Sequence, residues 1–174
     1  MPMGGSFTSD SVRAASRADA AACAEIYRPH VEHGTATFET EAPDVGEMEA
    51  RIGRCLERGW PWLVAERDGE MIGYAYCTQF RDRAAYRHTA ENSVYVRSEL
   101  AGQGVGRLLM QALLPEARAS GFQQLIAVIG DSGNAGSIGL HRAFGFRDAG
   151  VMTEVGCKFG RWIDVVFMQL ELRR

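Results

Sequence analysis

The sequence predicts an α/β fold in which a mixed sheet carries helices on both faces. Along the 174 residues, the apolar pattern changes repeatedly between the strand period of two and the helical period, with no internal repeat. The dipeptide Asp68-Gly69 separates two apolar segments, which is the signal of a β-hairpin. Residues 89–114 have the pattern of a strand, a glycine-rich turn and an apolar helix.

Seven short segments have the composition and the alternation of strands. The pair around Asp68-Gly69 is expected to be antiparallel, and the last two segments are expected to form a second hairpin around residues 157–161. In chain order, the predicted strands are 12–15, 62–66, 71–80, 89–97, 124–129, 146–155 and 162–172.

Helical patterns lie between these strands. Asp19 begins the first helix, and Pro29 is expected to bend or end it because proline lacks a backbone donor, which leaves residues 30–40 irregular. Asp44 caps a second amphipathic helix that ends at Gly59. A third helix is predicted directly after the glycine-rich turn, and a fourth over residues 135–144.

The composition is that of one ordinary globular domain, with 46% hydrophobic and 24% charged residues. Residues 1–11 are expected to be a flexible leader, and residues 12–174 a single domain. A formal net charge of −3 without a long basic run argues against a nucleic-acid partner. The sequence has no apolar run of membrane-spanning length and no signal-peptide pattern, so we expect a cytoplasmic protein with no membrane partner.

The four cysteines are far apart and include no Cys-x-x-Cys pair. This spacing indicates neither a disulfide framework nor a metal site, so no metal is predicted. We expect the cysteines to be reduced, partly buried small side chains. They are Cys23, Cys55, Cys77 and Cys157.

The glycine-rich turn is suited to bind an anion. Gly102, Gly104 and Gly106 lack the Cβ atoms that would keep a ligand away from the main chain. The helix that follows directs unpaired N–H groups and its positive dipole end toward the turn, which favours a phosphate or pyrophosphate. The sequence lacks the Gly-Lys-Ser/Thr of nucleoside triphosphatases, and Leu109 stands where a dinucleotide fingerprint needs glycine. The alternative is that these glycines only form a turn.

The strand and turn together resemble the acyl-coenzyme A loop of the GNAT superfamily of N-acetyltransferases, whose pattern is Arg/Gln-x-x-Gly-x-Gly/Ala. Ala101 departs from that pattern, because it stands where the superfamily has Arg or Gln. Further segments resemble the branch that acetylates phosphinothricin and methionine sulfoximine, and the similarity runs from about residue 12 to the end of the chain. These segments are 35–39, 85–93, 134–141 with Gly145-Phe146, and 156–166.

The resemblance implies a GNAT-like, mostly antiparallel sheet and acetyl-CoA as co-substrate. It also implies that residues 94–96 splay from the neighbouring strand, so that pantetheine amides can pair with exposed main chain. The N–H of Val96 would then steady the developing oxyanion. The expected cofactor-binding residues are Val94, Tyr95, Val96, Gly102, Gln103, Gly104, Val105, Gly106, Arg107, Asn134 and Ser137.

Glu91 is the predicted general base. In a strand, Glu91, Ser93 and Tyr95 share one face, and a carboxylate that is partly desolvated at a cofactor cleft has a raised pKa. The alternative is that Glu91 forms a salt bridge with Arg87 or Arg97. Glu39 is a second, weaker candidate for the base.

His141 stands at the position of a superfamily tyrosine that protonates the leaving thiolate, so the resemblance implies an acid role for it. The alternative is a core histidine bonded to a backbone carbonyl. Asn134 and Ser137 are expected to bind the pantetheine arm or to cap their helix.

The acceptor is expected to be a small amino-acid-like amine of the phosphinothricin, methionine sulfoximine or sulfone type. Arg81 and Arg83 could bind its carboxylate as bidentate forks, although a solvated loop is the alternative. Phe38 and Tyr86 could wall the pocket or belong to the core. The full expected set is Phe38, Glu39, Arg81, Arg83, Tyr86, Asn92 and Ser93.

Direct acetyl transfer in a ternary complex is the predicted reaction. An acetyltransferase for proteins or peptides and a non-catalytic acyl-CoA sensor are the alternatives. A homodimer is implied by resemblance, with Trp162 and Asp164 near its interface or the pocket rim.

Overall fold

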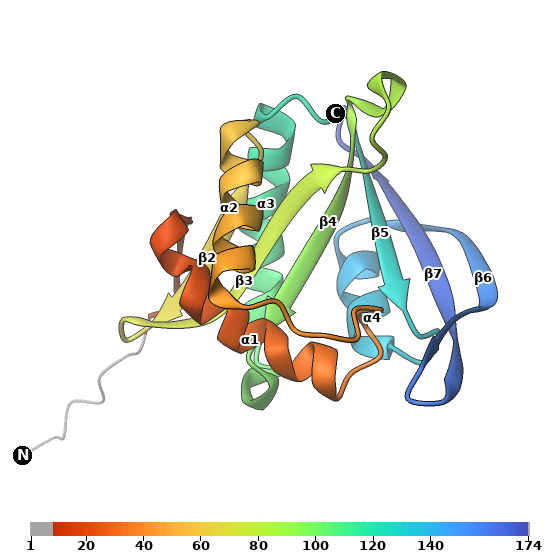
Figure 1. Ribbon diagram of the computed structural model, residues 1–174. Coiled ribbons are helices and arrows are strands. Elements are labelled where there is room, and N and C mark those ends of the chain that lie inside the picture. Colours follow the sequence, from red (N-terminus) through yellow and green to blue (C-terminus); the bar gives the residue numbers. More distant parts are fainter. Residues whose placement is uncertain (1–8, 174) are drawn as a thin grey trace, which may run out of the picture.

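The computed structural model describes residues 9–173, which form a seven-stranded sheet in the order β1-β2-β3-β4-β5-β7-β6 (Figure 1). Neighbouring strands are antiparallel except for β4 and β5, which are parallel. The prediction of an α/β fold with a mixed, mostly antiparallel sheet is confirmed. The strands are β1 Ser11–Ala14, β2 Trp62–Arg67, β3 Glu70–Gln79, β4 Thr89–Val96, β5 Gln124–Gly130, β6 Arg147–Lys158 and β7 Arg161–Glu171.

Helices cover both faces of the sheet, and strand alternation supplies a core to each. Leu63, Ala65 and Ala75 contribute to the core beneath α3, whereas Trp62 and Tyr74 contribute to the core beneath α1 and α2. In Figure 1, α1 and α2 lie in front of the sheet and α3 behind it. The helices are α1 Ala20–Glu32, α2 Val45–Glu57, α3 Val105–Ala119 and α4 Ala135–Ala143.

Three short 3₁₀ helices, which the sequence analysis did not predict, complete the described chain. They are Arg17–Asp19, Ala84–Tyr86 and Ser98–Leu100. The predicted leader lies mostly outside the described residues, and its last residue, Ser11, pairs with Glu66 in the sheet. None of the described helices combines the length and the apolar character needed to cross a membrane.

The sequence predicted that Pro29 bends or ends the first helix. The helix does not end there, because α1 continues to Glu32. Proline removes only one backbone donor, and the turn after it closes normally, with the N–H of His33 donating to the carbonyl of Pro29 at 3.0 Å. Val31 is fully buried beyond the proline. Burial of that side chain offsets the lost hydrogen bond.

The two hairpins have the same kind of turn. Asp68 and Gly69 have φ values of 52° and 82°, as the Asp-Gly signal predicted. Between β6 and β7, Phe159 and Gly160 have φ values of 53° and 70°, so this turn is shorter than the predicted segment 157–161. A bulky residue with positive φ is not a turn signal in sequence, which is why the boundary was missed.

The sheet opens between β4 and β5. The parallel ladder joins residues 89–92 to residues 124–127 and ends at the pair of Asn92 and Ala127. Beyond that pair, β4 stays on β3 through Val96, and β5 stays on β7 through Gly130. The two strands therefore have unpaired edges that face a gap.

Lys158 holds residues 34–37, which lie against Gly130 at the end of β5. Its ammonium group is almost fully buried and donates to the carbonyls of Gly34 and Thr37, both at 2.8 Å. Phe38 packs directly over Gly156, where a Cβ atom would collide with its ring. The β6–β7 hairpin thus fixes the position of residues 34–38.

We expect Lys158→Met to lower the free energy of unfolding by about 2 kcal/mol, because it leaves two buried carbonyls without a donor. Chemical denaturation measures this change. The exposed control Arg118→Met should stay within about 0.5 kcal/mol of the parent protein. Equal stability of the two variants would contradict the role of Lys158.

Candidate active site

A cleft of about 470 Å³ runs along the open edge of β4 to the start of α3. All but one of the predicted cofactor-binding residues line it, and the exception is Gln103. The side chain of Gln103 contacts Arg67 and the carbonyl of Glu99 instead. The cleft is also lined by residues that the sequence analysis did not select, namely His30, Ala36, Ser98, Leu100, Ala101, Gly136 and Leu140.

The glycine-rich turn has the conformation that the sequence predicted for it. Gly102 and Gly104 have φ values of 78° and 88°, which L side chains rarely adopt, and Gly104 caps α3. A Cβ atom on Gly106 would lie 3.2 Å from Leu140, so glycine also lets α4 approach α3. The first N–H groups of α3 have no partner within the helix and are available to an anion.

The open edge of β4 presents main-chain groups to the gap. The N–H of Arg97 donates to the carbonyl of Ile72 on the β3 side at 3.0 Å. Main-chain groups alternate sides along a strand, so the N–H groups of Val94 and Val96 point away from β3 and into the gap. The carbonyl of Val96 is bonded to the ring of His30 at 2.9 Å.

Glu91 lies on the α1 and α2 face of β4, opposite Thr78 of β3. It is half-buried, and burial raises the pKa of its carboxyl, while the charge of Arg81 partly lowers that pKa. Among the described residues, no arginine lies within ion-pair distance of Glu91: Arg97 pairs with Glu25 at 2.8 Å. The salt-bridge alternative is therefore not what the structure adopts.

Glu39, the second candidate for the base, is fully occupied by other groups. Its carboxylate accepts from the guanidinium of Arg51 at 2.7 and 3.1 Å and from the hydroxyl of Tyr27 at 3.1 Å. Glu91, by contrast, has a raised pKa and forms no ion pair with any described side chain.

His141 lies on the opposite face of the sheet and is almost fully buried. Its Nδ1 atom donates to the carbonyl of Ser137 at 2.8 Å, and its Nε2 atom lies 2.9 Å from the amide nitrogen of Asn92. Burial lowers the pKa of this imidazole. In the neutral form with its hydrogen on Nδ1, His141 has no proton at Nε2, so the proton-donor role predicted from the sequence requires Nε2 to be protonated and released from Asn92.

Asn92 is not brought together with the expected acceptor residues. Its neighbours Glu91 and Ser93 point to the α1 and α2 face, whereas Asn92 points to the α3 and α4 face and contacts Met110 and His141. Asn134 caps α4, with its side-chain oxygen accepting from the N–H of Ser137 at 3.1 Å. The capping alternative for Asn134 is therefore what the structure shows.

The loop between β3 and β4 carries the expected carboxylate-binding residues, and its side chains are exposed. Arg81 stacks on Phe80 with 4.1 Å between its guanidinium carbon and the ring centre. Tyr86 lies edge-on to the same ring at 5.8 Å. Arg83 is exposed on this loop, and Phe38 and Tyr86 each keep 39% of their surface accessible, so neither aromatic residue belongs to the core.

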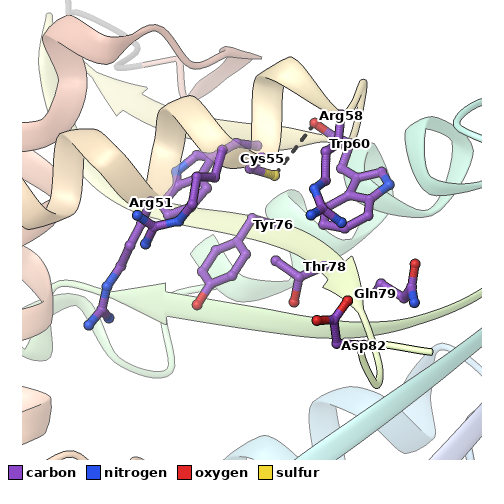
Figure 2. Close-up of a pocket in the computed structure, with 10 residues that line it drawn as sticks. Arg51, Cys55, Arg58, Trp60, Tyr76, Thr78, Gln79 and Asp82 are labelled. Atoms are coloured by element: carbon purple, nitrogen blue, oxygen red, sulfur yellow. Dashed lines mark hydrogen bonds between the residues drawn. The ribbon is translucent and has the colours of Figure 1, made fainter.

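A second pocket of about 350 Å³ lies on the Glu91 face, between α2 and β3 (Figure 2). Thr78, which pairs with Glu91, and Tyr76, which pairs with Ser93, line it. Burial raises the pKa of Tyr76 to about 12, which keeps its phenol neutral. The other lining residues are Arg51, Arg54, Cys55, Arg58, Trp60, Trp62, Gln79 and Asp82.

The fold and the site together are typical of one class of protein. Its sheet is splayed and suited to a phosphate-bearing carrier beside the start of a helix, and it has a partly desolvated carboxylate on a strand that borders the gap. The acetyltransferase (GNAT) domain family matches residues 12–167. The chain belongs to this family and is an N-acetyltransferase.

Three similar proteins indicate which branch of the family the chain resembles. The phosphinothricin N-acetyltransferase of Alcaligenes faecalis is 52% identical over 162 residues, 93% of this chain and 82% of that protein. The L-methionine sulfoximine/L-methionine sulfone acetyltransferase of Pseudomonas aeruginosa is 44% identical over 165 residues, 94% of this chain and 95% of that one. A Salmonella typhimurium acetyltransferase, solved with its cofactor acetyl-CoA, has a TM-score of 0.93 and 40% identity, with 96% of each chain covered. The predicted GNAT branch is confirmed.

Proposed function

We propose that this protein transfers the acetyl group of acetyl-CoA to the amine of a small amino-acid-like acceptor of the phosphinothricin, methionine sulfoximine or sulfone type. The observation that carries the proposal is Glu91, a half-buried carboxylate with a raised pKa that pairs in the sheet with Thr78 of the second pocket. The two named relatives supply the acceptor class.

The carrier would bind mainly to main chain. The N–H groups at the start of α3 suit its pyrophosphate, and Arg107 is a cationic side chain in the same cleft. Ala101 adds no polar contact, so we assign part of the missing charge to Arg107. The N–H of Val96 would pair with a carbonyl of the pantetheine arm as an added strand does.

Glu91 would take a proton from the acceptor's ammonium group, which frees the amine to attack the thioester carbonyl. Val94 lines the cleft deeper in the gap than Val96, so its N–H, in place of the predicted N–H of Val96, would donate to the developing oxyanion. The leaving thiolate then takes a proton, from water or from His141; donation by His141 requires a protonated Nε2 in place of its contact with Asn92.

Transfer in a ternary complex is supported by the cysteines. Burial raises the pKa of the thiols of Cys23, Cys55 and Cys77, and Cys157 lies on β6. None of the four cysteines lines the cleft along β4 and α3, which we call the carrier cleft. The described residues therefore offer no thiolate there for an acetyl-enzyme. Thiol release from acetyl-CoA in the presence of each acceptor tests the proposal; tight binding without turnover of any amine would favour a sensor.

We expect Glu91→Gln to lower kcat by about two to four orders of magnitude while the Kd for acetyl-CoA changes less than about twofold. In the parent protein, kcat should rise with pH through a pKa above that of an ordinary carboxyl, because the base must be ionised. Arg81→Gln should move this rise to higher pH, because the arginine charge lowers that pKa. An unchanged pH profile in Glu91→Gln would remove Glu91 from the mechanism, and Glu116→Gln on α3 is the control.

The pocket of Figure 2 favours an acceptor with an anionic end group, because Arg58 lines it and has no carboxylate partner among the described residues. We expect Arg58→Gln to raise KM about fivefold for phosphinothricin, whose phosphinate is charged, and less than about twofold for neutral methionine sulfone. Steady-state kinetics with both acceptors measure the difference, with Arg118→Gln as the control. Equal effects on both acceptors would place the end group elsewhere.

We further propose a cytoplasmic homodimer that uses the β6–β7 hairpin. Apolar side chains of this hairpin are unusually exposed: Val151, Met152, Val155, Phe159 and Trp162. Sedimentation equilibrium should show a dimer for the parent protein and a monomer for Trp162→Glu, whereas Val45→Glu, at another exposed apolar position, should stay dimeric. A monomeric parent protein at tens of micromolar would rule this interface out. Fractionation of cells that express the protein would test its location.

A further inference from the structure

The inner end of the gap between β4 and β5 contains one polar atom that has no partner. Asn92 is 5% exposed, and its side-chain oxygen Oδ1 makes no hydrogen bond to any described residue. A buried carbonyl without a donor costs roughly 1–3 kcal/mol, so such an atom calls for an explanation.

A chain of hydrogen bonds fixes the orientation of this amide. The carbonyl of Ser137 can only accept, so the Nδ1 atom of His141 carries the hydrogen of that 2.8 Å contact. In a neutral ring, Nε2 is then an acceptor, and the group that lies 2.9 Å from it must be the NH₂ of Asn92. Turning the amide over would place two acceptors against each other unless the imidazole were charged.

The surroundings of His141 disfavour that charged form. Phe146 lies edge-on to the ring at 4.9 Å, Ser137 offers its carbonyl, and Asn92 offers its amide. No carboxylate or other charged side chain of the described chain contacts the imidazole, and burial lowers its pKa. Neutral His141 therefore holds Nδ2 of Asn92 toward itself and turns Oδ1 away.

Both residues line a small cavity of about 60 Å³ at the point where the β4–β5 ladder ends. This cavity adjoins the carrier cleft, because the two share the lining residues Ala36, Val94, Tyr95, Asn134 and Ser137. A carrier whose phosphates lie at the start of α3 and whose arm follows β4 inward brings its thioester end to this cavity. The N–H closest to that end belongs to the terminal amide of pantetheine.

We propose that Asn92 is a carrier-binding residue whose Oδ1 atom accepts the terminal amide N–H of the pantetheine arm, and that His141 is a positioning residue that acts through Asn92. This inference rests on the proposed binding of acetyl-CoA in the cleft, but not on the identity of the acceptor amine. In this proposal, neutral His141 orients the amide of Asn92 and transfers no proton.

The experiment compares acetyl-CoA with an analogue in which an ester oxygen replaces the terminal amide N–H. Calorimetry with the parent protein should show the analogue binding about three- to tenfold more weakly, the effect of one buried hydrogen bond. Asn92→Leu, which keeps the side-chain size but removes the acceptor, should bind both ligands equally. Thr89→Val, on the same strand outside the cleft, should discriminate as the parent protein does.

Equal affinity of the parent protein for both ligands would overturn the proposal, as would undiminished discrimination in Asn92→Leu. Should Asn92→Leu fail to fold, Asn92→Ala removes the same acceptor without adding atoms to the core. If neither ligand binds the parent protein, the proposed function fails first. If both bind but no amine is acetylated, the acceptor assignment fails and this proposal stands.

The role of His141 has its own readouts. Nitrogen NMR of the parent protein should show the neutral tautomer with the hydrogen on Nδ1, and a protonated Nε2 would overturn the assignment. His141→Leu should weaken acetyl-CoA binding in the parent background and have no further effect in Asn92→Leu. Additive losses would mean that His141 acts on the ligand independently of Asn92.

Discussion

The loss of pairing between β4 and β5 is the constraint on which the rest of the structure depends. Each strand keeps its outer neighbour, so the gap can open without unravelling the sheet. The inner edges then carry main-chain groups that no strand satisfies, and such groups are costly when buried. A ligand that pairs along this edge would remove that cost, so the opening is suited to binding through the backbone.

Packing between distant elements positions the segments around the gap. At the end of β5, the main chain of Thr35 and Ala36 passes so close to Gly130 that a Cβ atom there would collide with it. Lys158 binds the carbonyls on either side of that segment, which ties the end of β5 to the last hairpin. At the outer end, Gly106 lets α4 pack against α3. The site therefore depends on contacts between elements that are far apart in the sequence.

The sequence could predict whatever local rules determine. The Asp-Gly turn, the Asp44 cap and the glycines before α3 are short-range signals, and all three lie where they were expected. Alternation also placed Glu91 and Ser93 on one face. The same rule puts Asn92 on the other face, but its partner His141 lies 49 residues away, and no local pattern reveals such a contact. The helix beyond Pro29 was missed for the same reason, since its stability comes from burial of Val31 in tertiary packing.

Successive residues of β4 point to opposite sides of the sheet, and we propose different roles for them. Glu91 faces the α2 side, where the pocket of Figure 2 has room for an acceptor, while Asn92 faces the α4 side, where the carrier cleft ends. If Glu91 and Asn92 have the proposed roles, the strand itself would hold a base and a carrier contact on adjacent residues at a fixed separation, without a mobile loop. Two substrates that approach one strand from opposite faces can meet only at the gap in the sheet. This arrangement favours direct transfer between them over relay through an enzyme side chain.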